Sequence, residues 1–405
     1  MLNASAANFD RPWSALTSVG RNAETGGYRR FAWTSTDMVL REWFAAEASA
    51  RGLDLVTDRA GNQWAWWGDP DVAADAGKPG VVMGSHLDSV PDGGAFDGPL
   101  GVVSAFAALD ALRESGFQPD RPVGIVNFVD EEGARFGIAC AGSRLITGVL
   151  SPDRARTLRD ADGVSMAEAM SSAGIRVEDI GRDNETLRRI GVFVELHIEQ
   201  GRGLVDLKAP VGVASSIWPH GRWRVELPGE ANHAGTTRLS DRRDPMLGYA
   251  RLVLGAREAA ANHNVVATCG KVHVEPNAVN AIPSLVTAWL DARGPAEPDL
   301  RQVIDDLTRL TTTEGGSLTE ESWTDETPFD ANLRDRLAKR LGDVPVLATG
   351  AGHDAGILAN AGLSTGMLFV RNPTGVSHSP SEFAELSDCL AGVEALAVAI
   401  EELAS

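Results

Sequence analysis

Residues able to bind a metal ion lie in a glycine-rich stretch, GSHLDSVPDGGAFDGPLG at positions 84–101. His86 and Asp88 come directly after an apolar run, and Asp97 comes directly before a helix-like run. Imidazole and carboxylate groups are common ligands of zinc and related ions. Asp88 could accept a hydrogen bond from the second ring nitrogen of His86 and so fix its tautomer. Taken alone, such a His-x-Asp sequence is more often part of a surface turn.

Acids and histidines also follow three further apolar runs. Asp130, Glu131 and Glu132 end the segment FVDEEG, where adjacent carboxylates repel one another unless a cation or a proton relieves the repulsion. One carboxylate of such a group can bind metal while its neighbour acts as a general base. His197 lies in VELHIEQG and His378 in VSHSPSE. Each segment alone has an ordinary structural explanation, but four of them together predict a metal site.

The elements that must position these residues follow from the apolar pattern. Continuous apolar runs at 80–85, 122–129 and 191–198 predict buried strands, and 100–115 predicts a helix. Strands that alternate with helices are typical of an α/β fold with a mainly parallel sheet. In such folds, sites form at the carboxyl ends of the strands.

The pattern changes after residue 201. Polar and apolar residues alternate at 222–227, 271–274 and 285–291, as in an antiparallel sheet with one wet face, and helices are predicted at 244–262 and 299–311. The α/β pattern returns from about residue 330, with a helix at 333–341, a strand at 366–370 and a last helix from Glu382. We therefore predict an α/β domain in two parts, 1–211 and 328–405, interrupted by a smaller α+β domain at 212–327.

Composition limits the classes of function. The 405 residues are too many for one ordinary core, and the net charge of −19 argues against nucleic acid and anionic membranes as partners. An anionic substrate would therefore need a local cationic site. Three scattered cysteines argue against a disulfide framework, and the start of the chain lacks a secretory signal pattern. These features predict a cytoplasmic protein.

Six motifs together resemble the N-carbamoyl-L-amino acid hydrolase and allantoate amidohydrolase family, a branch of the dinuclear-metal aminoacylase and carboxypeptidase clan. They are HLDSVPDGGAFDGPLG, DEEGARFG, ELHIEQG, GEANHAGTT, NAVNAIP and GHDA, in order along nearly the whole chain. The resemblance implies an α/β catalytic domain interrupted by a lid domain that also forms a homodimer interface. It also implies two divalent metal ions, zinc or manganese, with cobalt or nickel as further possibilities.

The resemblance also assigns roles at the metal site. His86, Asp97 and His197 match the ligands of one ion, and Asp97 matches the carboxylate that bridges to the second. Glu132 and His378 match the other ligands of the second ion. Glu131 matches the general base, and we group Asp88 with the catalytic residues as the partner of His86.

Substrate contacts are assigned in the same way. His233 matches a residue that stabilises the oxyanion or contacts substrate, supplied by lid closure either within one subunit or across a dimer interface. Asn280 and Arg293 match a pair that holds the substrate carboxylate, while Gln200 and His353 match residues beside the substrate. In WPHGRW, where many relatives carry a Gly-Gln-Arg run, Arg222 is a possible second anion contact. The segment RNPTG before His378 also departs from the family pattern.

The resemblance implies hydrolysis of the ureido or carbamoyl C–N bond of a small carboxylate, either allantoate or an N-carbamoyl-L-amino acid, with release of ammonia and carbon dioxide. The same clan leaves open hydrolysis of N-acyl or N-formimino amino acids, or of small peptides. A catalytically silent relative is a third alternative. It would be expected to lack the base or a ligand, and this chain lacks none of them.

Overall fold

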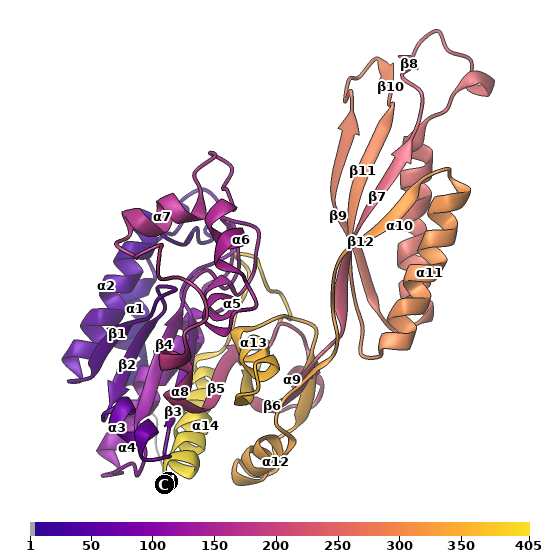
Figure 1. The fold of residues 1–405 in the computed structure, drawn as a ribbon. Coiled ribbons are helices and arrows are strands. Elements are labelled where there is room, and N and C mark those ends of the chain that lie inside the picture. Colours follow the sequence, from indigo (N-terminus) through magenta and orange to yellow (C-terminus); the bar gives the residue numbers. More distant parts are fainter. Residues whose placement is uncertain (1–4) are drawn as a thin grey trace. The chain divides into compact units, whose positions relative to one another are not determined.

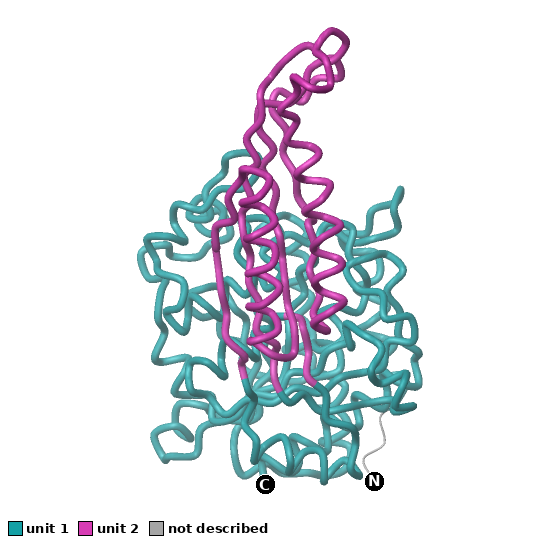
Figure 2. The backbone as a smooth tube through the Cα atoms, turned by 90° about the vertical axis from the view of Figure 1, so that its right-hand side faces the viewer, with its two compact units in different colours: residues 1–215, 328–347, 352–405 teal, residues 216–327, 348–351 magenta. Residues whose placement is uncertain are grey.

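The computed structural model describes residues 5–405. Residues 1–4, the start of the stretch that lacks a secretory signal pattern, lie outside the described residues. The chain forms two compact units (Figure 2). The large unit comprises the chain up to residue 215 together with 328–347 and 352–405, and the small unit comprises 216–327 and 348–351.

One mixed sheet organises the large unit (Figure 1). Within the described residues its strands are β1 (Asp54–Thr57), β2 (Gln63–Trp67), β3 (Gly80–His86), β4 (Val123–Phe128), β5 (Ile190–Ile198), β6 (Val211–Ile217), β13 (Thr327–Pro328), β14 (Val346–Thr349) and β15 (Ser364–Val370). Their order is β1-β2-β4-β3-β5-β15-β6-β13, with β14 beside β6. The central strands β4, β3, β5 and β15 are parallel, as expected. Strands β1 and β2 pair antiparallel with each other, β2 pairs antiparallel with β4, and β6 pairs antiparallel with β15, so the sheet is mixed.

Helices cover the sheet. They are α1 (Ala6–Leu16), α2 (Ser35–Ala50), α3 (Pro70–Asp75), α4 (Pro99–Glu114), α5 (Ala141–Thr147), α6 (Pro152–Thr157), α7 (Met166–Ser172), α8 (Asn184–Arg188), α9 (Gly203–Asp206), α12 (Ala331–Arg340), α13 (Asp354–Asn360) and α14 (Leu386–Ala404). Side chains of α1, α2, α4 and α14 join one buried apolar cluster with strand residues such as Met83 and Leu196. Strand β3 is buried along its whole length, which explains its continuous apolar sequence. Among residues 5–405, no helix is long and apolar enough to cross a membrane.

The predicted start of the last helix was wrong. The helix begins at Leu386 and not at Glu382. Glu382 lies in a turn, where its N–H donates to the carbonyl of Ser379, and its buried side chain accepts hydrogen bonds from another loop. Glu385 has an extended backbone, with φ of −70° and ψ of 140°, so the helical conformation cannot continue back from Leu386 to Glu382.

The loop between β3 and α4 has a steric requirement that explains its glycines. Gly98 has a φ of +82° and directly precedes α4. A Cβ atom at this position would overlap the imidazole of His86. Only glycine both adopts this backbone conformation without strain and leaves room for the ring. The close approach brings the start of α4 against the end of β3.

The small unit is an antiparallel sheet covered on one face by two helices (Figure 1). Its elements are β7 (His220–Pro228), β8 (Asn232–His233), a 3-10 turn (Leu239–Asp241), α10 (Pro245–Asn262), β9 (Val266–Glu275), β10 (Ala281–Ile282), β11 (Leu285–Arg293), α11 (Glu297–Thr313) and β12 (Ser317–Thr324). The sheet order is β12-β7-β11-β9, and β8 pairs separately with β10. Every second residue of β11 is buried, which confirms the predicted alternation. Trp223, Leu290 and Leu307 belong to a core of this unit's own.

The core of the small unit gives a stability prediction. Leu307 on α11 is 1% exposed, so Leu307→Ala should lower the free energy of unfolding by about 2–5 kcal/mol through lost burial and a residual cavity. Urea unfolding monitored by tryptophan fluorescence would measure the change. Asp305→Ala, at an exposed position on the same helix, is the matched control and should leave stability nearly unchanged. Equal effects of the two substitutions would contradict the packing described here.

Candidate metal centre

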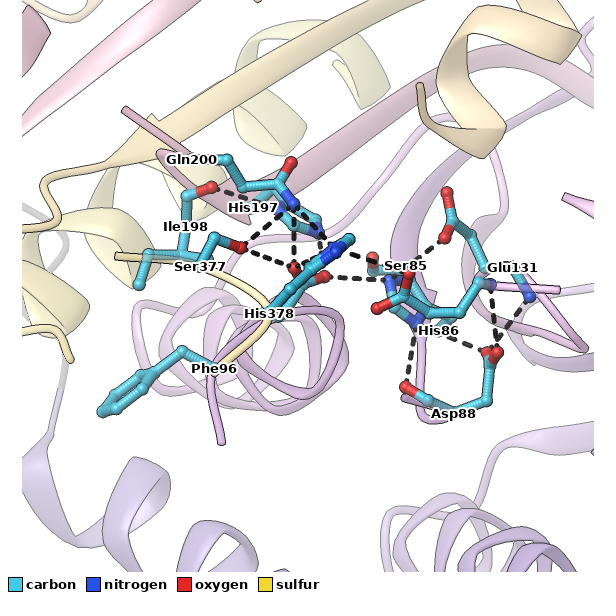
Figure 3. A network of polar contacts seen from close by, with 12 residues as sticks. Ser85, His86, Asp88, Phe96, Glu131, His197, Ile198, Gln200, Ser377 and His378 are labelled. Carbon is cyan, nitrogen blue, oxygen red and sulfur yellow. Dashed lines mark hydrogen bonds and ion pairs between the residues drawn. The ribbon is translucent and has the colours of Figure 1, made fainter. Parts of the chain in front are cut away.

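The predicted metal ligands of the large unit meet at one edge of its sheet (Figure 3). His86 is the last residue of β3, and His197 is the second-last residue of β5. Glu132 follows β4 and His378 follows β15, while Asp97 lies just before α4. Because the four central strands are parallel, their carboxyl ends share this edge.

Asp97 is common to two groups of side chains that could hold a cation. Its Oδ1 lies 3.5 Å from Nε2 of His86 and 3.1 Å from Nε2 of His197. Its Oδ2 lies 3.4 Å from Nε2 of His378, which is 3.6 Å from Oε2 of Glu132. The structure therefore brings all five predicted ligands together as two groups, with one oxygen of Asp97 in each.

The histidine tautomers fit a cation. Nδ1 of His86 lies 3.2 Å from the carbonyl oxygen of Asp88, and Nδ1 of His197 lies 2.9 Å from that of Ile198. A ring nitrogen beside a carbonyl carries the hydrogen, so Nε2 keeps its lone pair. Both Nε2 atoms are buried without a hydrogen-bond partner, and both face a carboxylate oxygen. The Nε2 lone pairs and the negatively charged carboxylate oxygen that they face repel one another. A cation bound between them would turn this repulsion into attraction.

Asp88 links the histidine to the two acids after β4. Its Oδ1 lies 3.3 Å from Nδ1 of His86 and accepts the N–H of Glu131 at 3.1 Å. Its Oδ2 accepts the N–H of Glu132 at 3.0 Å. Glu131 Oε2 lies 3.8 Å from Nε2 of His86, and the Cys140 thiol donates to Glu131 Oε1 at 3.3 Å. Asp88 thus holds both acids at the edge of the first ligand group.

Burial sets the protonation of this site. It raises the pKa of Glu131 well above its ordinary value, although the nearby His86 opposes the rise. Burial likewise raises the pKa of Glu132 to about 7. Burial also works against ionisation of Asp97, but the positive charge of protonated His197 and the hydrogen bonds from the three histidines outweigh burial and hold the pKa of Asp97 well below its ordinary value. A cation bound at the Nε2 atoms would take the place of these protons. Asp97 is therefore the ionised carboxylate of the cluster. Added positive charge would also favour the ionised forms of Glu131 and Glu132.

Two predicted substrate residues lie beside the same cluster. Gln200 donates through Nε2 to Asp97 Oδ2 at 2.8 Å, while its own Oε1 is buried without a partner. The His353 ring packs on that of His197 with centroids 4.5 Å apart, and its Nε2 is also buried without a partner. Both side chains therefore have unused polar atoms close to the ligand groups.

Sequence reasoning missed two residues that support the ligands. Ser377 donates through Oγ to Asp97 Oδ2 at 3.2 Å. The carboxylate of Glu195 accepts the Ser85 hydroxyl at 2.7 Å and forms a third possible ligand group with His197 and His353. Both residues lie within two positions of a predicted ligand, and that proximity was the only signal in the sequence.

His233 and Asn280 lie together in the small unit. Their segments pair as β8 and β10, where Ala281 is opposite His233, and the N–H of Ala234 donates to the Asn280 carbonyl at 3.0 Å. The N–H of Gly235 donates to Nδ1 of His233 at 2.9 Å. Nδ1 is therefore the acceptor, so Nε2 carries the hydrogen of this exposed ring.

Arg293 and Arg222 lie at the other end of the small sheet, on either side of Asp291. Arg293 donates through Nε and Nη2 to the Asp291 carboxylate at 2.7 and 3.0 Å, and Arg222 reaches it at 3.3 Å. Strand β11 separates Arg293 from the Asn280 end by about 25 Å, at about 3.3 Å per residue. The predicted pair of Asn280 and Arg293 therefore cannot hold one small carboxylate within a single chain.

Known proteins resemble this chain along nearly its whole length. The family model described as Peptidase family M20/M25/M40 matches residues 82–402. The N-carbamoyl-L-amino acid amidohydrolase of Geobacillus stearothermophilus is 35% identical, with 98% of this chain and 98% of the relative covered. The allantoate amidohydrolase of Escherichia coli (strain K12) is 32% identical, with 97% and 96% covered. The crystal structure of AtUAH in complex with (S)-hydroxyglycine matches with a TM-score of 0.86 and 28% identity, covering 99% and 98% of the two chains.

The shared position of Asp97 leads to a metal-binding prediction. Asp97→Ala should abolish tight binding of Zn²⁺ by both ligand groups, whereas His378→Ala should weaken binding only by the group that contains Glu132. Mass spectrometry of the metal content of dialysed, Zn²⁺-loaded protein would measure the difference. Equal loss of zinc from the two variants, with the fold intact by circular dichroism, would contradict the two-group arrangement.

Proposed function

This chain belongs to Peptidase family M20/M25/M40 and is a hydrolase of carbon–nitrogen bonds, and we propose that it removes the carbamoyl group from a small ureido acid. Allantoate and N-carbamoyl-L-amino acids are the candidate substrates, after the names of its two relatives. The observation that carries the proposal is the Asp97 carboxylate shared by two ligand groups, with Glu131 beside them.

Two divalent ions fit the ligand groups. His86, His197 and Oδ1 of Asp97 would hold one ion, and His378, Glu132 and Oδ2 of Asp97 would hold the other. When bound, such ions would polarise the substrate carbonyl and make a water molecule at the site more acidic. Zinc or manganese suits these nitrogen and oxygen donors, and cobalt or nickel would also be accepted.

Glu131 is the proposed general base. Its carboxylate takes a proton from the attacking water and later returns it to the leaving nitrogen. The backbone N–H of Glu131 donates a hydrogen bond to Asp88, and the Cys140 thiol donates one to the Glu131 carboxylate. These two contacts fix the position of Glu131. Water adds to the ureido carbonyl and the C–N bond breaks, which gives the free amine and carbamic acid. Carbamic acid then decomposes to ammonia and carbon dioxide.

His233 is the proposed donor to the oxyanion that develops during this attack. Its Nε2–H is exposed, and its Nδ1 is already satisfied by Gly235. A fixed donor of this kind stabilises charge as it forms. The chain enters and leaves the small unit beside His220 and Thr324, at the end of the sheet opposite His233. We therefore assign His233 and Asn280 to the active site of a second subunit.

The edge strand β9 is the proposed contact between the two subunits. It pairs only with β11 in the sheet and exposes Val266 and Val272, so its free edge can pair with a second copy of itself. The other edge strand, β12, carries Glu320 and Glu321, and these acids would repel a second copy. Two β9 strands related by a twofold axis would make a homodimer.

The substrate carboxylate is proposed to bind between the two subunits. Asn280 would come with His233 from one subunit and Arg293 from the other, while Gln200 and His353 beside the ligand groups are proposed to contact the rest of the substrate. Arg293 and Arg222 carry two positive charges, and Asp291 between them carries one negative charge. The remaining positive charge supplies the cationic site that a chain of net charge −19 needs in order to bind an anion.

The cytoplasm is the proposed location. Cys140, Cys269 and Cys389 are all free thiols. Disulfide bonds are common in oxidising compartments and rare in the cytosol. Three unpaired cysteines therefore favour a reducing compartment.

Loss of the base gives the first test of the function. Glu131→Gln should keep the bound zinc and lower kcat by about 10²–10⁴-fold, because the proton acceptor is lost while the ligands remain. Ammonia release from allantoate and from a panel of N-carbamoyl-L-amino acids, with the metal-loaded protein, would measure it. Absence of turnover of every ureido acid by folded, metal-loaded wild-type protein would overturn the proposed substrate class.

Subunit mixing tests the shared active site. Glu131→Gln and His233→Ala should each be inactive alone, because each removes one part of every site. A refolded equal mixture should recover about a quarter of the wild-type activity, since half the dimers are mixed and each mixed dimer has one intact site. Activity assays before and after mixing would show this. If mixing restores no activity although mixed dimers form, His233 does not act across subunits.

A further inference from the structure

Glu382 connects two loops that are far apart in the sequence. Its Oε2 accepts the backbone N–H groups of Phe96 and Asp97 at 2.8 and 2.9 Å. Its side chain is buried, with 5% of the residue exposed, and it lies in neither of the Asp97-containing ligand groups. A buried carboxylate with this contact fixes the backbone of Asp97 from behind, while the side chain of Asp97 faces the histidines.

The other oxygen of Glu382 reaches the loop of His378. Oε1 lies 3.3 Å from Oγ of Ser377, which is also 3.2 Å from Asp97 Oδ2, so the one hydroxyl hydrogen is shared between the two carboxylates. Glu382 therefore contacts Asp97 twice, directly at its backbone and through Ser377 at its carboxylate. Ser377 directly precedes His378, so the same contacts also hold the position from which His378 reaches its ligand group.

Neighbouring residues leave the Glu382 side chain little freedom. A Cβ atom on Gly94 would overlap its carboxylate, so the Asp97 loop approaches Glu382 as closely as a glycine permits. Phe383, the next residue, packs edge-to-face on Phe96 with ring centroids 6.1 Å apart. Polar and aromatic contacts thus join the same two loops side by side.

We propose that Glu382 is a positioning residue that holds the loops of Asp97 and His378 in register, so that both oxygens of Asp97 stay aligned with their ligand groups. The inference rests on the metal centre of the proposed function. Because Asp97 belongs to both groups, a shift of its backbone disturbs both, whereas loss of an ordinary outer ligand disturbs one. Partners behind metal ligands typically contribute about 10–100-fold to metal affinity or activity.

The test compares three substitutions in the full-length protein. Glu382→Ala removes the acceptor, whereas Glu382→Gln keeps an amide oxygen that can accept both N–H groups. Asp330→Ala is the matched control, since Asp330 also accepts two backbone N–H groups and a serine hydroxyl, from Asn332, Leu333 and Ser364, away from the site. Zn²⁺ affinity by calorimetry, Mn²⁺–Mn²⁺ coupling by electron paramagnetic resonance, kcat and Tm would be measured for each.

Glu382→Ala should lower Zn²⁺ affinity and kcat by about 10–100-fold and abolish the Mn²⁺ coupling, and Glu382→Gln should restore most of both. Asp330→Ala should lower Tm alone. If Glu382→Ala does not fold, Gly94→Ala, which pushes the carboxylate aside, should reproduce its metal defect. Unchanged affinity and coupling in Glu382→Ala would overturn the inference, and so would equal defects in Asp330→Ala. Failure of the wild-type protein to bind two ions would instead remove the proposed metal centre itself.

Discussion

A buried carboxylate is costly unless hydrogen bonds or positive charge compensate it, and the edge of the large sheet is built around one such group, Asp97. Its two oxygens face different histidines, and serine and glutamine side chains donate to it. The parallel centre of the sheet is what permits this arrangement. Phe369 of β15 is level with His197 of β5, and His86 of β3 is level with Phe128 of β4, so the segments after all four strands reach the same carboxylate.

That the side chains around Asp97 lie together could be predicted because they lie beside strands buried on both faces. Such strands have continuous apolar sequences, and a charged or histidine residue at their end stands out. The order β4-β3-β5-β15 and the antiparallel outer strands could not be predicted, since nothing local encodes which strand lies beside which. The contacts of Glu382 could not be predicted for the same reason. They join residues that are 286 and 285 positions apart in the sequence. The sequence around Glu382 instead predicts the start of a helix.

The substrate residues show a different limit of sequence reasoning. A motif names Asn280 and Arg293 as a pair, but pairing in function does not require proximity in one chain. The nine residues of β11 keep them at opposite ends of the sheet. The register of β7 and β11 places Arg293 opposite His220, near the connections to the large unit, and leaves His233 at the far end. This separation, and not the motif itself, is the argument for a second subunit.

The two units carry different groups of the proposed site residues. In the large unit, His86, His197 and Asp97 are buried and each has a further hydrogen-bond contact near the carboxyl ends of the strands. The small unit has a separate apolar core that includes Trp223, Leu290 and Leu307, and none of its polar site residues belongs to that core. His233 on β8 and Asn280 directly before β10 are exposed, and Arg222 lies on the wet face of the sheet. Residues there can change with little cost to stability, so we expect substrate preference to be determined in the small unit while the ligand groups stay fixed.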